Sequence, residues 1–145
     1  MIRQREKRTM TGGFTLVEVL VVVVIIGVLA ALVVPRVVGR ADQARAAAAT
    51  QDIASIMSAL KMYQNDNGRF PSGEQGLQAL VTRPTIDPQP NNWRACLDRL
   101  PLDPWKRPYQ FLNPGIHGEI DIFTLGADGQ PGGAEADKDI GSWEL

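Results

Sequence analysis

An unbroken apolar run from Val19 to Pro35 is the part of this 145-residue sequence that most limits how the chain can fold. A helix over residues 14–34 would be about 30 Å long, which matches the hydrocarbon thickness of a bilayer. The run is dense in valine and isoleucine, as buried strands are. It is nevertheless too long for an ordinary strand, and in lipid a helix satisfies every backbone polar group. We therefore predict a transmembrane helix over residues 14–35.

A short basic leader precedes the apolar run. Residues 1–13 carry a charge of +3 within a total of −1, so the rest of the chain carries −4. Basic residues favour the cytoplasmic side of a membrane and place the N-terminus there, although Arg36, Arg40 and Arg45 beyond the run weaken this asymmetry. The acidic remainder has no basic stripe, which argues against nucleic-acid binding.

The order of the leader and the apolar run decides what survives processing. A secretory signal peptide is cut after its apolar region, and Ala30-Ala31 could imitate such a cleavage site. Here, however, the glycines suited to processing, Gly12 and Gly13, lie before the apolar run. We expect residues 1–13 to be removed as a leader, so that the apolar helix remains on the mature chain.

Glu18 is an acidic residue at the entrance of the apolar segment. An ionised acid in a membrane helix costs roughly 2.5 to 3.5 kcal/mol on insertion, so such residues are usually functional and paired. Cleavage after Gly13 would give Phe14 a free amine one helical turn from Glu18. That amine and the carboxylate could pair within one chain or between neighbouring subunits. The alternative is a shallow Glu18 that reaches the lipid headgroups.

Residues 36–145 are enough for one small domain of about 110 residues. Pro35 lacks an amide donor and clashes with the preceding turn, so we expect it to bend or locally melt the helix. Helical periodicity then predicts an amphipathic helix over residues 37–65, which Asn67-Gly68 ends as a C-terminal cap. Its apolar stripe should cover the core of the domain and comprises Ile53, Ile56, Met57, Leu60 and Tyr63.

Prolines recur between residues 66 and 108 and predict an irregular connection around one short helix within 73–83. Alternating residues then predict two antiparallel strands over 107–112 and 119–125. A hairpin of this size is not stable alone, so it should lie against the long helix in an α+β architecture. Four aromatic residues should anchor the connection to the core, with a sugar-binding platform as the alternative: Trp93, Trp105, Tyr109 and Phe111.

Cysteine and histidine occur once each, as Cys96 and His117. A single cysteine forms no internal disulfide, and we expect it to behave as a half-buried apolar residue. A single histidine leaves neither a histidine metal cluster nor a Ser-His-Asp or Cys-His set with spare candidates. We therefore expect a chain that is not an enzyme, with a membrane-anchored hydrolase dependent on His117 as the alternative.

The segment from Gly13 to Glu18 resembles the type III signal of type IV pilins and type II secretion pseudopilins. The glycine, the phenylalanine, the apolar residues that follow and the glutamate all fall in place, and Pro35 stands where that family has a helix-kinking proline. The resemblance implies that a prepilin peptidase cuts after Gly13 and methylates the new N-terminal Phe14. It also implies that Glu18 neutralises the N-terminal amine of an adjacent subunit during assembly.

Two further segments, residues 63–80 and 100–109, resemble the major, G-type pseudopilins of the type II secretion system. The likeness runs through essentially the whole chain. One departure is Lys106, where the family usually has a glycine after the tryptophan. Type IV pilins commonly close a C-terminal loop with two cysteines, which a chain with only Cys96 cannot do.

This resemblance implies a type IV pilin-like fold and a structural role. The chain would be a single-pass protein of the bacterial inner membrane with residues 36–145 in the periplasm. It would polymerise into a helical periplasmic filament, together with minor pseudopilins and an inner-membrane platform, to drive export of folded proteins across the outer membrane. The alternatives are a type IV pilin subunit and a membrane-anchored binding module that never polymerises, for which an acid at Glu18 has no use.

An acidic, glycine-rich stretch extends from Leu125 to Trp143. Calcium takes six to eight oxygen ligands in flexible geometry, but the stretch lacks EF-hand spacing, and on its own such a loop is more often a solvated turn. The resemblance implies a structural calcium ion here. By position, the ligands it implies are the Asp128 side chain, the Leu125 and Gln130 carbonyls, and Asp137 or Asp139, with Glu135 a weaker candidate.

Overall fold

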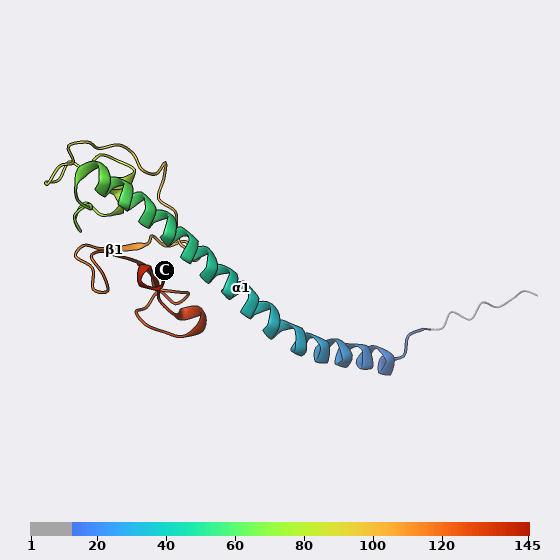
Figure 1. Ribbon diagram of the computed structural model, residues 1–145. Helices are drawn as coiled ribbons and strands as arrows, with labels where there is room; N and C mark the ends of the chain where they lie inside the picture. The colour runs from blue at the N-terminus through green and yellow to red at the C-terminus, as the bar shows by residue number, and fades with distance from the viewer. Residues whose placement is uncertain (1–12) are drawn as a thin grey trace, which may run out of the picture. The chain divides into compact units, whose positions relative to one another are not determined.

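The computed structural model describes the backbone of residues 13–145 and the side chains of residues 13–32 and 39–145 (Figure 1). The leader, up to Gly12, lies outside the described residues, and so do the side chains of Pro35 and Arg36. The chain divides into two compact units, one ending at Gly39 and one from Arg40 to Leu145.

One helix, α1, begins at Leu16, ends at Asn67 and takes up 52 residues. Its helical backbone continues through Pro35, so the helix does not melt there, while a bend at Pro35 stays a prediction. A proline removes one intrahelical hydrogen bond, while the bonds of the neighbouring turns keep the backbone helical. The apolar segment and the amphipathic segment are therefore the two halves of one long N-terminal helix, as the resemblance implied.

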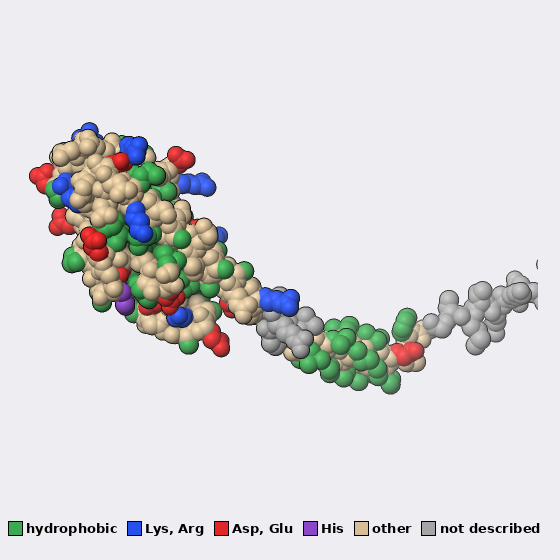
Figure 2. Space-filling model, viewed as in Figure 1, with side chains coloured by type: hydrophobic (Ala, Val, Ile, Leu, Met, Phe, Trp, Pro, Cys, Tyr) green, Lys and Arg blue, Asp and Glu red, His purple; other side chains and the backbone are tan. Residues whose placement is uncertain are grey.

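In the first unit, the start of α1 exposes its apolar side chains. Over residues 14–32 the large apolar side chains range from 48% exposed at Val21 to 86% at Phe14, and Figure 2 shows them as an apolar surface. Within the described part of the chain, no helix provides an apolar stretch of the length that a membrane crossing requires. The predicted span includes residues 33–35, whose side chains lie outside the described residues.

The second unit is built around the C-terminal half of α1. Buried residues recur on α1 every three or four positions and therefore share one face: Ala49, Ile53, Ile56, Leu60 and Tyr63. This face is the predicted stripe, with Met57 only partly buried at its edge. Gly68 then ends the helix as predicted. Its φ of +74° lies in the left-handed region, and its amide donates to the Gln64 carbonyl at 2.7 Å.

The connection from α1 to the sheet is irregular, as its prolines predict. Its only regular element among the described residues is a 3₁₀ turn, η1, from Leu77 to Leu80. The Gln75 side-chain amide donates to the carbonyls of Ile86 and Pro88 at 2.8 and 2.9 Å, and the Trp93 indole donates to the Ala79 carbonyl at 2.8 Å. Tyr109 lies in the core, and Trp93, Trp105 and Phe111 pack against the core, so the predicted anchoring by aromatic residues is confirmed. The half-buried Cys96 also packs against the core, as expected.

The sheet has three antiparallel strands in the order β1-β2-β3. Strand β1 (Gln110–Leu112) and strand β2 (Asp121–Thr124) form the predicted hairpin and are shorter than expected. Strand β3 (Ile140–Gly141) was not predicted and pairs with β2. Two more 3₁₀ turns, η2 (Glu135–Asp137) and η3 (Ser142–Glu144), flank β3. The α+β architecture is therefore confirmed.

Candidate assembly site and cation-binding loop

The first turn of α1 holds the carboxylate of Glu18 close to Thr15. The Glu18 Oε2 atom accepts hydrogen bonds from the Thr15 amide at 2.8 Å and the Thr15 hydroxyl at 2.9 Å. The Glu18 amide in turn donates to Thr15 Oγ1 at 3.2 Å. This reciprocal arrangement is a capping box, which satisfies amides that a helix start leaves free. Glu18 thus has partners within its own chain.

Thr15 is a residue that the sequence analysis did not single out. The signal was present, because a threonine followed three residues later by a glutamate, just before an apolar run, is the sequence pattern of a capping box. The pairing of Glu18 with a Phe14 amine stays a prediction, as do cleavage at Gly13 and methylation of Phe14.

The glycine-rich loop from Leu125 to Asp139 folds back on itself. Gly126 has a φ of +61°, and a Cβ added there would lie 2.5 Å from the Asp137 carbonyl oxygen. The Ala127 amide donates to the Ala136 carbonyl at 2.9 Å, which ties the first arm of the loop, residues 125–130, to its second arm, residues 131–139. Only glycine fits at Gly126, because the backbone of the second arm lies directly against it.

The predicted ligands have different partners in this loop. One oxygen of Asp128 accepts from the Gln130 amide at 3.0 Å, and the Leu125 carbonyl accepts from the Gly129 amide at 3.1 Å. The side chains of Asp137 and Glu135 are exposed, and Glu135 begins η2 with a φ of +53°. Asp139 is half-buried, and its Oδ2 accepts from the Gly132 amide at 2.9 Å.

The other oxygen of Asp139, Oδ1, is buried and has no hydrogen-bond partner. A buried carboxylate oxygen without a partner is costly and suits a cation that supplies the missing interaction. No three histidine, cysteine or acidic side chains come together in a metal-binding arrangement within the described residues. A cation here would therefore take backbone carbonyls beside Asp128 and Asp139. With that donor set, the loop fits a hard, oxygen-seeking ion.

Asp121 forms a second buried acidic centre, at the hairpin turn. Its side chain is 2% exposed and accepts from the amides of Ile116 and His117 at 2.7 and 2.9 Å. The His117 Nδ1 atom lies 3.2 Å from the same oxygen, and the His117 ring stacks on Trp143 with 4.0 Å between centroids. Burial raises the pKa of Asp121, but the hydrogen bonds from His117 and Ile116 outweigh it and leave the pKa lowered. No sequence pattern pointed to this group.

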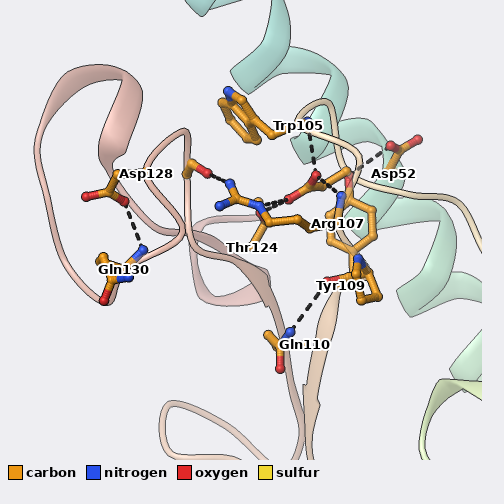
Figure 3. A network of polar contacts seen from close by, with 11 residues as sticks. Asp52, Trp105, Arg107, Tyr109, Gln110, Thr124, Asp128 and Gln130 are labelled. Atoms are coloured by element: carbon orange, nitrogen blue, oxygen red, sulfur yellow. Dashed lines mark hydrogen bonds and ion pairs between the residues drawn. The ribbon is translucent and has the colours of Figure 1, made fainter.

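A network of polar contacts joins α1, the connection and the loop (Figure 3). Asp52 on α1 accepts a hydrogen bond from the Tyr109 hydroxyl at 2.8 Å. Burial, and next the hydrogen bond to Asp52, raise the pKa of the buried Tyr109, which stays a neutral donor. Beside this pair, Arg107 extends from the connection towards the glycine-rich loop.

Comparison with known proteins identifies the class to which this fold belongs. The fold matches the crystal structure of the major pseudopilin from the type 2 secretion system of enterohaemorrhagic Escherichia coli, with a TM-score of 0.68 and 46% identity over 78% of this chain and 98% of that one. Residues 8–34 match the prokaryotic N-terminal methylation motif. A long helix that starts in this motif and packs on a small antiparallel sheet defines a pilin-like subunit.

The particular family follows from the rest of the chain. Residues 36–143 match the family model of type II secretion system protein G. Relatives include the type II secretion system core proteins G of Pseudomonas aeruginosa, 54% identical over 95% of this chain and 99% of the relative, and of Vibrio cholerae, 52% identical over 92% of each. That of Pectobacterium carotovorum is 56% identical over 92% of this chain and 85% of the relative. The chain belongs to the type II secretion system protein G family.

Proposed function

We propose that the chain is a non-catalytic, structural subunit of the pseudopilus of a type II secretion system. The observation that carries this proposal is the match to core protein G over 95% of the chain. The exposed apolar surface of residues 14–32 adds support, because a helix with that surface requires lipid or neighbouring subunits around it. The subunit polymerises with copies of itself and drives export of folded proteins across the outer membrane.

The same proposal includes a path from membrane to filament. A prepilin peptidase cuts between Gly13 and Phe14 and methylates the Phe14 amine. Residues 14–35 hold the chain in the inner membrane with residues 36–145 in the periplasm, until minor pseudopilins and an inner-membrane platform take it into the filament. The match to the methylation motif over residues 8–34, which includes the proposed cleavage site and Glu18, supports this sequence of events.

Cross-linking in intact cells that carry the secretion system tests the subunit proposal. Pairs of cysteines placed on the exposed side of α1, in a Cys96→Ser background, let each subunit be joined to two neighbours and should yield a ladder of multimers. The matched control carries the same cysteines with Gly13→Leu, which should block processing and leave monomers alone. A processed chain that remains monomeric while secretion proceeds would contradict the proposal.

We further propose that the glycine-rich loop binds a structural calcium ion. Asp128 and Asp139 would supply carboxylate oxygens, and Leu125 and Gln130 would supply carbonyls, with Asp137 as the competing acidic ligand. The buried, unpartnered Asp139 Oδ1 supports this assignment and favours Asp139 over the exposed Asp137. When bound, the ion supplies positive charge that holds the two arms of the loop together.

Thermal unfolding of the full chain in an uncharged detergent tests the calcium site. At 100 times the dissociation constant, calcium should stabilise the folded chain by about 2.7 kcal/mol relative to chelator. Asp139→Asn should remove most of this difference, whereas Asp98→Asn, at an exposed position in the connection, should leave it unchanged. Equal melting temperatures with calcium and with chelator would exclude the site.

A further inference from the structure

Arg107 links the connection to the first arm of the glycine-rich loop, residues 125–130. Its Nη2 atom donates a hydrogen bond to the Gly126 carbonyl. The guanidinium also lies against Gly129, where a side chain would collide with it, and Gly129 has a φ of +71°. Figure 3 shows Arg107 reaching from the connection to this arm. The arm is therefore shaped around the arginine side chain.

The guanidinium is itself held by a buried acid, Asp103. The Asp103 side chain is 1% exposed, and its Oδ2 lies 3.6 Å from Arg107 Nε. Its Oδ1 accepts from the amides of Trp105 and Arg107 at 3.0 and 2.8 Å, and its Oδ2 accepts from the Thr124 hydroxyl at 2.5 Å. Since Thr124 belongs to β2, the sheet fixes Asp103, and Asp103 fixes the arginine.

These contacts of the first arm are all made by groups of the protein itself. The Gly126 carbonyl is bound by Arg107, and the Leu125 carbonyl and Gly129 amide close a turn at 3.1 Å. The second arm is tied to the first through Ala127 and Ala136. Its own ends are joined by the Asp139 amide, which donates to the Gly132 carbonyl at 3.1 Å. The second arm is thus held both by the first arm and by contacts between its own ends.

We propose that Arg107 is the positioning residue of the cation-binding loop. By holding residues 125–130 before any ion arrives, it preorganises the Leu125 carbonyl and the Asp128 carboxylate as ligands. This inference rests on the calcium site proposed above. The positive charge of Arg107 acts in the opposite direction, because it repels a cation. Removal of the side chain therefore has two opposed effects on calcium affinity, and the proposal requires that the loss of positioning is the larger.

The test compares Arg107→Met with a matched control, Arg69→Met, in the full chain in uncharged detergent. Arg69 also donates to two backbone carbonyls, those of Pro88 and Gln89 at 2.9 and 2.8 Å, but in the connection. In calcium titrations, Arg107→Met should raise the dissociation constant about tenfold, equivalent to about 1.4 kcal/mol. The control should match the wild type. Unchanged or tighter binding by Arg107→Met would overturn the proposal.

Hydrogen exchange in chelator supplies a readout that does not depend on calcium. The amides of Ala127 and Gly129 should lose about tenfold protection in Arg107→Met and none in Arg69→Met. Arg107→Lys keeps a cation beside Asp103 but lacks the forked guanidinium, so it preserves the fold and should fall between wild type and methionine. Unchanged exchange in both Arg107 variants would overturn the positioning role. A wild-type chain that binds no calcium would contradict the site, while exchange would still decide whether Arg107 holds the arm.

Discussion

Lys106 occupies a backbone position that suits glycine. Its φ is +66°, in the left-handed region where an L-residue costs roughly 1 kcal/mol or more. The turn around it is nevertheless intact, because the Lys106 amide donates to the Asp103 carbonyl and the Asp103 amide donates to the Arg107 carbonyl, both at 2.8 Å. The turn at Lys106 therefore makes both of its hydrogen bonds while the lysine backbone is strained.

Lys106→Gly should therefore stabilise the chain. Glycine relieves the left-handed strain of the folded chain but adds conformational freedom to the unfolded chain. The first effect is the larger, so the free energy of unfolding should rise by about 0.5 kcal/mol. Denaturant unfolding measures it. Lys61→Gly, at an exposed position inside α1, is the control and should destabilise by about 1 kcal/mol. A destabilised Lys106→Gly would show that the lysine side chain has a favourable contact of its own.

Glu18 has one observed role, in helix capping, and one proposed role, in pairing with an amine, and a single substitution separates the two. The capping box with Thr15 needs only an acceptor oxygen, whereas pairing with an amine needs a negative charge. Glu18→Gln keeps the acceptor and removes the charge. We expect Glu18→Gln and Glu18→Ala to insert and be processed, yet to give no multimers when cells are cross-linked. A normal ladder from Glu18→Gln would assign the residue to helix capping alone.

The C-terminal half of α1 stabilises the second unit through one face. Leu60 is fully buried on that face, whereas Met62, two residues on, is 45% exposed. Leu60→Ala should lower the free energy of unfolding by about 2 to 5 kcal/mol, because it leaves a cavity in the core. Met62→Ala on the same helix should change it by less than about 0.5 kcal/mol. Unfolding of the two variants in detergent, followed by circular dichroism, measures the contrast, and equal losses would contradict the observed face.

The hairpin formed by β1 and β2 makes stability depend on pH through Asp121. The folded-state pKa of this carboxyl lies below its unfolded value of about 3.9, so its contribution is present above that pH and is lost as the pH falls through the folded pKa. The wild type should be more stable than Asp121→Asn near pH 6, and the difference should shrink below about pH 4. A difference that stays constant down to pH 3 would contradict the lowered pKa.

The elements differ in how far their sequences predict them. The buried face of α1 follows from its period, and the hairpin follows from alternation between turn residues. Strand β3 has two residues, which is too short for any period, and it forms only because the glycine-rich loop brings Ile140 beside Thr124. The continuity of α1 through Pro35 depends on the hydrogen bonds of the turns on both sides of the proline. The effect of proline on its own turn does not predict it.

The candidate sites also differ in how far the sequence predicts them. Glu18 stands out because an acid in an apolar run is costly, and Thr15 follows from local spacing. The bond between Asp103 and Thr124 joins residues 21 positions apart, so only the folded chain reveals what holds Arg107. The buried oxygen of Asp139 is likewise a property of the folded loop, and no pattern in the sequence distinguishes it from Asp137.

The whole molecule consists of two units with opposite surfaces. In the unit up to Gly39, residues 14–32 expose their apolar side chains, whereas the unit from Arg40 to Leu145 encloses a core of its own. Such a core satisfies the usual requirement for independent folding, while the apolar surface requires lipid, detergent or other copies.

A fragment of residues 40–145 should therefore be monomeric and unfold cooperatively without detergent, whereas the full chain should associate when detergent is removed. Sedimentation and denaturant titration measure both properties. The comparison must be made at equal protein concentration, because association depends on it. An unfolded or aggregated fragment would show that the first unit contributes to the stability of the second.

The half-buried Cys96 has a chemical consequence for work on this chain. Burial, and then the nearby Asp66 carboxylate, raise the pKa of its thiol, so little of the reactive thiolate forms at neutral pH. The sequence contains no other cysteine, so the fold is not stabilised by an internal disulfide bond. The chain should fold equally well in reducing and oxidising compartments, and thiols introduced on its surface will react well before the native one.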